Sequence, residues 1–187
     1  NMVGIPIDKE FRAVSPKESD DYIKKLGIDE KSKKVLVTGG SLGAKRINYL
    51  IVCTIKDLNK LGVQILHQTG SKETTVQAKL IKRDLKQPEL YVPFDFSAEM
   101  VTLYGASDVV VSRAGASAIQ ELANSGKPAI LIPAALTDQK KNARIIDELG
   151  AALVADQAEL LEKPEEFIGE LQFMLGDENI RTSLSEN

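Results

Sequence analysis

The residues of this chain that could do chemistry gather in short segments that follow apolar runs. The most informative is SRAGASAIQEL (Ser112–Leu122), which comes after three valines. A helix beginning at Ala116 and Ser117 would point its first backbone N–H groups at an anion, and Arg113 would add a rigid fork of donors. Glu121 would lie one turn further on, where its carboxylate could accept both hydroxyls of a ribose. We therefore predict a site for a nucleotide diphosphate; the alternative is an ordinary acid near a helix start, worth about 0.3–1 kcal/mol.

Two loops of small residues would leave backbone N–H groups accessible to a ligand. One is Ala114–Ala118. The other is TGGSLGAKRIN (Thr38–Asn48), in which Gly40, Ser41 and Gly43 precede a predicted helix. Its glycines match neither the Walker pattern nor the dinucleotide fingerprint, so the sequence disfavours NAD. The alternative is a tight glycine turn without a ligand.

An aromatic loop follows the third apolar run. In VPFDF (Val92–Phe96), Phe94 or Phe96 could lie over a flat ring, while backbone groups read the edge of a base. We expect Phe94 to face the base; the alternative is a hydrophobic contact beneath the next helix.

Sugar-binding groups are expected in PAALTDQKKNAR (Pro133–Arg144). Asp138 and Gln139 stand at the start of a predicted helix, and carboxylate and amide side chains suit sugar hydroxyls. The alternative is a helix cap by Thr137 or Asp138.

The elements that must position these loops alternate between strand and helix. The apolar runs are continuous, as in strands covered on both faces, and they comprise Val35–Gly39, Val63–Thr69, Glu89–Phe94, Asp108–Ser112, Ala129–Pro133 and Ala151–Ala155. Helical spacing is predicted over 15–27, 44–61, 76–85, 98–104, 117–125, 139–149, 164–175 and 178–184. The order predicts an α/β fold, a Rossmann-like doubly wound parallel sheet of about six strands, with ligands at the carboxyl ends of the strands.

The composition is that of an ordinary globular domain. The chain has 187 residues and a formal net charge of -3, which gives no global attraction to nucleic acid. Cys53 is the single cysteine, and no apolar run is long enough to span a membrane. We expect residues 1–14 to be a linker from a missing N-terminal domain and residues 15–187 to be the binding domain.

Several catalytic patterns are missing from the sequence. It has no D-x-D pair, no Cys/His cluster with zinc spacing and no G-x-S-x-G elbow. His67 is the single histidine, and a lone histidine at a strand end is more often a packed, hydrogen-bonded residue than a catalyst. We expect no catalytic base in this chain, no metal and no cofactor.

The loops together resemble a known family. GGSLGAKRIN, HQTG, VPF, DVVVSRAGASAIQEL, GKPAILIP and QKKNAR, in this order, are similar to the C-terminal half of the MurG-type transferases, over roughly residues 3–159. The resemblance implies one half of a GT-B fold, with UDP-N-acetylglucosamine as donor and a lipid-linked acceptor. It implies an inverting, metal-independent transferase of peptidoglycan synthesis, at the cytoplasmic face of the bacterial membrane.

The resemblance also implies roles for individual residues. Ser41 would contact a phosphate, the loop at Phe94 would face uracil, Arg113 and the helix start at 116–118 would hold the diphosphate, and Glu121 would hold the ribose. The sugar would be held by Gln139, with Asp138 and Asn142 nearby. The sequence departs from the family at Asp8, where an arginine is common, and at Asp138 and Ala118.

Alternatives remain open at this stage. The chain could be half of another UDP-sugar enzyme, such as a glycolipid synthase or an epimerase. It could also be a noncatalytic module whose partner chain carries the acceptor site. Either way, the resemblance places the acceptor loop and the catalytic base outside this chain, in an N-terminal half.

Overall fold

A single parallel sheet organises the molecule. The structure is a computed structural model that describes residues 14–29, 31–40, 44–135 and 137–187. Within these ranges six strands pair in the order β3-β2-β1-β4-β5-β6, all in parallel. They are β1 (Lys34–Thr38), β2 (Gln64–Gln68), β3 (Tyr91–Phe94), β4 (Val109–Ser112), β5 (Ala129–Leu131) and β6 (Leu153–Val154). Five of them lie within the predicted apolar runs and β1 starts one residue before its run, so the predicted Rossmann-like sheet is confirmed.

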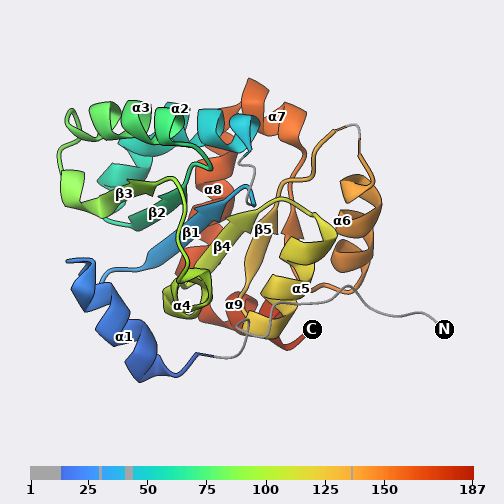
Figure 1. Cartoon of the computed structure of the whole chain (residues 1–187). Coiled ribbons are helices and arrows are strands. Elements are labelled where there is room, and N and C mark those ends of the chain that lie inside the picture. The colour runs from blue at the N-terminus through green and yellow to red at the C-terminus, as the bar shows by residue number, and fades with distance from the viewer. Residues whose placement is uncertain (1–13, 30, 41–43, 136) are drawn as a thin grey trace.

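Helices separate the strands and close the fold (Figure 1). They are α1 (Pro16–Lys25), α2 (Lys45–Lys60), α3 (Lys72–Lys82), α4 (Met100–Ala106), α5 (Ala116–Ser125), α6 (Gln139–Glu148), α7 (Gln157–Glu162), α8 (Pro164–Gly176) and α9 (Glu178–Glu186). Within the described ranges, no helix has the length and apolar character needed to cross a bilayer.

Local capping explains where the predicted boundaries were wrong. Helix α3 begins four residues before the predicted start, because the Ser71 side chain accepts a hydrogen bond from the Thr74 N–H. Helix α7 was not predicted; it has six residues, too few for a periodic pattern, and it starts where Asp156 accepts from two backbone N–H groups. The strand expected from Glu89 starts later, because Pro88–Leu90 form a 3-10 turn.

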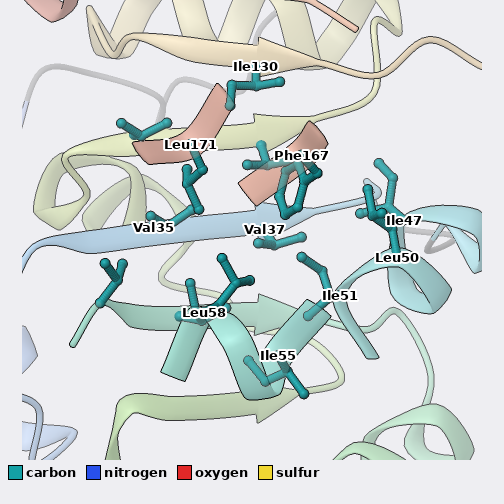
Figure 2. Close-up of a cluster of buried hydrophobic side chains, with 14 of the residues drawn as sticks. Val35, Val37, Ile47, Leu50, Ile51, Ile55, Leu58, Ile130, Phe167 and Leu171 are labelled. Atoms are coloured by element: carbon teal, nitrogen blue, oxygen red, sulfur yellow. The ribbon is translucent and has the colours of Figure 1, made fainter. Parts of the chain in front are cut away.

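One hydrophobic core lies on the face of the sheet covered by α2, α3, α7 and α8. Figure 2 shows Val35 and Val37 of β1 between side chains of α2 and α8, including Phe167 and Leu171. Because these residues are almost completely buried, each aliphatic or aromatic side chain contributes about 1.5–3 kcal/mol to folding. This core fixes α2 against the sheet.

A second core covers the opposite face under α1, α4, α5 and α6. It includes Leu36, Leu66 and Val110 from the strands, with Tyr104 and Leu122 from the helices. Alternation along each strand sends neighbouring residues to opposite cores, as the pairs Val35/Leu36 and Val109/Val110 show. Both faces are therefore covered, as the continuous apolar runs predicted.

The strand order positions the functional loops. From β1 the chain builds outward through β2 and β3 on one side, and from β4 it builds through β5 and β6 on the other. The loops after β1 and β4 therefore diverge at the carboxyl edge of the sheet. Such a switch point leaves a crevice where α/β proteins bind ligands.

Candidate functional site: a cavity at the switch point

A cavity of about 340 Å³ opens between the loops that follow β1 and β4. Seven predicted site residues line it: Gly40, Arg113, Ala116, Ser117, Ala118, Glu121 and Gln139. The lining is completed by Thr38, Gly39, Gln68, Phe96, Met100 and Gly115. The structure therefore brings together residues from five separate segments of the sequence, at or after the ends of the strands β1 to β5.

The start of α5 offers backbone donors to this cavity. Gly115 precedes the helix, no side chain caps it, and the first turn holds no acid. By contrast, Ser15, Ser71 and Asp156 cap α1, α3 and α7 with their side chains. The first N–H groups of a helix carry partial positive charge. Those of α5 lie beside the cavity without a side-chain acceptor, where an anion would satisfy them.

Arg113 supplies a positive charge at the same place. Its Nη1 donates to the backbone carbonyl of Ile132 at 2.8 Å, which ties the guanidinium to the end of β5. Burial lowers its pKa from the ordinary value, yet an arginine stays charged near neutral pH. No carboxylate pairs with Arg113 among the residues that the structure describes. Four of its five N–H donors therefore remain for a ligand.

Glu121 faces the cavity from α5 with one oxygen held. The Tyr104 hydroxyl donates to its Oε2 at 3.3 Å. Burial raises the pKa of Glu121, and the hydrogen bond from Tyr104 lowers it in part. Tyr104 is buried, and burial together with Glu121 raises the pKa of its hydroxyl, which therefore stays a donor. Oε1 of Glu121 has no partner in the described part of the chain, so it can accept from a ligand hydroxyl.

The residues predicted to bind the sugar separate into different environments. Gln139 lines the cavity, and its Oε1 accepts from the Ala134 N–H at 3.0 Å, which leaves the Nε2 donors available. Asp138 is exposed and pairs with Lys141 at 3.1 Å, away from the cavity lining. Asn142 donates to the Ala114 carbonyl at 3.1 Å and so joins α6 to the loop after β4. In this structure Gln139 alone of the three reaches the cavity.

The loop after β1 enters the site through Gly39 and Gly40. Gly40 has a φ of 76°, a conformation that glycine adopts without strain, and its N–H donates to Thr38 Oγ1 at 3.1 Å. Thr38 in turn donates to Gln68 on β2, so a polar bridge joins the ends of the two strands. Ser41 and Gly43, which we also predicted as site residues, lie outside the described residues.

Phe96, not Phe94, contributes the aromatic ring of the cavity. Phe94 packs against the second core, and its carbonyl accepts from Thr69, while the Phe96 side chain is 66 % exposed. The sequence offered both residues for this position. Phe96 lies beyond the end of β3, where the loop can turn its ring toward the crevice.

Several residues at or next to the cavity were not predicted as site residues, among them Tyr104, Thr38, Gln68 and Met100. Thr38 and Gln68 end adjacent strands, so a rule that inspects every strand end would have found them. Tyr104 gave no sequence signal, because it lies on the preceding helix α4 and meets Glu121 through packing in three dimensions.

A second cavity, of about 360 Å³, lies elsewhere, between α5, α6 and the last residues. Its lining is largely apolar, and the Lys127 Nζ there already donates to the Gly105 carbonyl at 2.6 Å. Within the part of the chain that the structure describes, its lining has neither an arginine nor an uncapped helix start, in contrast to the cavity at the switch point.

Comparison with protein families identifies the class. The chain belongs to the family described as glycosyltransferase family 28 C-terminal domain, whose model matches residues 34–181. The chain is 35 % identical over 194 aligned residues to a UDP-N-acetylglucosamine–N-acetylmuramyl-(pentapeptide) pyrophosphoryl-undecaprenol N-acetylglucosamine transferase of Flavobacterium psychrophilum. That match covers 100 % of this chain and 49 % of the relative. A transferase of the same name from Bacteroides fragilis is 34 % identical over 84 % of this chain and 42 % of its own length.

Solved structures give the same fold. The crystal structure of MurG from Acinetobacter baumannii matches with a TM-score of 0.69 and 25 % identity, over 96 % of this chain and 52 % of that one. A glycosyltransferase from Rickettsia africae matches with a TM-score of 0.73 at 13 % identity, over 92 % of this chain and 46 % of that one, a likeness of fold alone. The chain spans about half the length of the curated relatives it matches.

Proposed function

We propose that this chain is the donor-binding half of a MurG-like transferase, and that its donor is UDP-N-acetylglucosamine. The observation that carries the proposal is the cavity at the switch point. Among the described residues, it joins an uncapped helix start, an arginine without a carboxylate partner and a glutamate with one free oxygen. These three groups fit a diphosphate next to a ribose. The family and the names of the relatives support the sugar and the peptidoglycan pathway.

Each group has a separate part in the proposed complex. The N–H groups of residues 116–118 and the guanidinium of Arg113 hold the diphosphate, Glu121 accepts from the ribose hydroxyls, and Gln139 donates to the sugar. Phe96 covers the base. Asp138 and Asn142 act at a distance in this arrangement, by supporting the start of α6 and the loop after β4.

The chemistry in this half is stabilisation of a leaving group. When the acceptor hydroxyl attacks the anomeric carbon, the bond to the diphosphate breaks and negative charge grows on UDP. Fixed N–H dipoles and Arg113 stabilise that charge without reorganising. We propose that the reaction inverts the anomeric centre and needs no metal, and that the base lies on the other half. The whole enzyme would act on a lipid-linked acceptor at the cytoplasmic face of the membrane.

The test is a titration of the chain with uridine, UDP, UDP-N-acetylglucosamine, UDP-glucose and NAD, followed by calorimetry or by NMR where affinity is weak. Arg113→Met should weaken UDP by roughly tenfold or more and leave uridine unchanged, because uridine has no phosphate. Glu121→Ala should weaken both by similar factors, because both carry the ribose. If UDP-N-acetylglucosamine does not bind, the proposed site is wrong. It is also wrong if Arg113→Met, like Glu121→Ala, weakens uridine as much as it weakens UDP.

A further inference from the structure

His67, Asn48 and Tyr91 form a buried polar chain behind the switch point. His67 is 0 % exposed and Asn48 is 7 % exposed. His67 Nδ1 lies 2.8 Å from the Tyr91 hydroxyl and its Nε2 lies 3.0 Å from Asn48 Oδ1. Asn48 Nδ2 donates to the Thr69 carbonyl at 2.9 Å. Three elements, α2, β2 and β3, therefore meet in one network, which the proposed function has not used.

The network itself assigns the protons. Asn48 uses its amide nitrogen on the Thr69 carbonyl, so its oxygen faces His67, and His67 Nε2 must carry a hydrogen to bond with it. The lone pair on Nδ1 then accepts from the Tyr91 hydroxyl. Complete burial lowers the pKa of His67 to about 3, so the ring is neutral at physiological pH. A neutral, fully bonded imidazole is a rigid spacer and not a proton shuttle.

The position of Asn48 gives the network a consequence for the site. Asn48 lies in the first turn of α2, and its own N–H donates to the Ala44 carbonyl at the helix start. In the ranges that the structure describes, no side chain caps this helix, and no acid lies in its first turn. On the other face of the sheet, Thr38 and Gln68 join the same strand ends and line the cavity. The end of β2 is thus bonded on both faces, to Asn48 of α2 through His67 and to Thr38 of β1 through Gln68, since His67 and Gln68 are neighbours that point in opposite directions.

We propose that Asn48 and His67 are positioning residues of the donor site, which fix the start of α2 against the end of β2. The backbone beside Gly39 and Gly40 is then held in place before a nucleotide arrives. This proposal rests on the proposed function, because it concerns the affinity of the same site. It assigns to the HQTG segment a role in holding the phosphate side of the cavity, through contacts that never reach the ligand.

The chain offers a matched control on the same helix. Asn59, near the end of α2, is 3 % exposed and also uses both ends of its side-chain amide. Its Nδ2 donates to the Gln87 carbonyl at 2.7 Å and its Oδ1 accepts from the Gln87 N–H at 3.1 Å. Gln87 precedes β3, at the opposite edge of the sheet from the cavity. Asn48→Ala and Asn59→Ala therefore each remove the hydrogen bonds of one buried asparagine on α2. The first variant removes them at the end of the sheet that carries the cavity, and the second at the opposite end.

The experiment measures thermal unfolding, UDP affinity and backbone amide exchange for both variants. We expect both to lower the melting temperature, and Asn48→Ala alone to weaken UDP, by roughly five- to tenfold. Exchange should accelerate at residues 48–51, whose N–H groups are the first to bond within α2, in Asn48→Ala and not in Asn59→Ala. If Asn48 only stabilised the fold, Asn48→Ala and Asn59→Ala would change the affinity for UDP equally. That result would overturn the proposal.

Variants of His67 provide a second test, which can be used even if Asn48→Ala fails to fold. In His67→Gln an amide can still donate toward Asn48, so affinity should stay closer to that of the unaltered chain than in His67→Ala. Equal UDP affinity in both would overturn the proposal. If the unaltered chain binds no UDP, the proposed function fails, and the exchange data alone decide the positioning role: unchanged exchange at residues 48–51 in Asn48→Ala refutes it.

Discussion

Replacing Glu121 with glutamine should move stability and affinity in opposite directions. Glu121 is half-buried in α5, and burial raises the pKa of its carboxyl, which the Tyr104 hydrogen bond offsets in part. A carboxyl whose pKa is higher in the folded than in the unfolded chain loses folding free energy as pH rises through that interval. An ordinary glutamate titrates at about pH 4.3, so the penalty sets in as pH rises above that value and is present at pH 7. Glu121→Gln removes the charge, keeps an oxygen for Tyr104, and should raise the melting temperature at pH 7.

The loss of affinity follows from the number of acceptors. One lone pair of Oε2 is used by Tyr104, which leaves Oε1 and the second lone pair of Oε2 for two ribose hydroxyls. Glutamine turns one of these oxygens into a donor and removes the charge from the other. Hydrogen bonds to charged groups contribute about 1.5–3 kcal/mol each. Glu121→Gln should therefore weaken uridine and UDP by roughly 10- to 100-fold.

The assay is a thermal melt at pH 4 and pH 7 beside a titration with uridine. The melting temperatures of Glu121→Gln and the unaltered chain should converge at pH 4, where the penalty disappears because the carboxyl is protonated in the folded state. Tyr104→Phe serves as the comparison, since it leaves the charge of Glu121 and removes a donor to it. A less stable Glu121→Gln at pH 7, or one that binds uridine normally, would refute the reasoning.

Three other changes test separate parts of the molecule. Phe96→Ala should weaken uridine and UDP by roughly fivefold or more, because it removes a stacking face, with little change in melting temperature since the ring is 66 % exposed. Gly126→Ala should cost about 1–2 kcal/mol in urea unfolding, because Gly126 ends α5 with a φ of 58°, and should leave UDP affinity unchanged. Removing divalent metals with EDTA should not alter UDP affinity, and a loss that Mg²⁺ restores would contradict a metal-independent site.

The sheet could be predicted because its physical signal is local. Strands covered on both faces are apolar throughout, and glycines placed after helical runs marked their ends: Gly27, Gly62, Gly126 and Gly150 all have positive φ. The boundaries of α3 and the presence of α7 depended on single capping residues, Ser71 and Asp156. Serine and aspartate are common in loops, so their presence did not single out these helix starts.

The site was predictable to the extent that it is made of strand ends. The rule that ligands bind at the carboxyl ends of the strands located Gly40, Arg113 and Glu121, and the strand order then places the ends of β1 and β4 next to each other. The sequence could not predict the direction in which each side chain points or the groups to which it bonds. Asp138 and Gln139 are adjacent and equally suited to sugar hydroxyls, yet only Gln139 turns inward, because its Oε1 bonds the Ala134 N–H.

The role of His67 was unpredictable for the same reason. From sequence, His67 was a lone imidazole at the end of a strand beside a predicted binding site. Whether such a residue is catalytic or structural depends on its burial, which the sequence does not show. In a Rossmann-like sheet the last residues of β2 alternate between the cavity and the core beneath α2, so Gln68 lines the cavity while its neighbour His67 is enclosed. A one-residue shift of register would exchange them and bring the imidazole to the cavity. The pairing of His67 with Val37 of β1 and Pro93 of β3 fixes that register, and with it the division between residues that line the cavity and residues buried behind it.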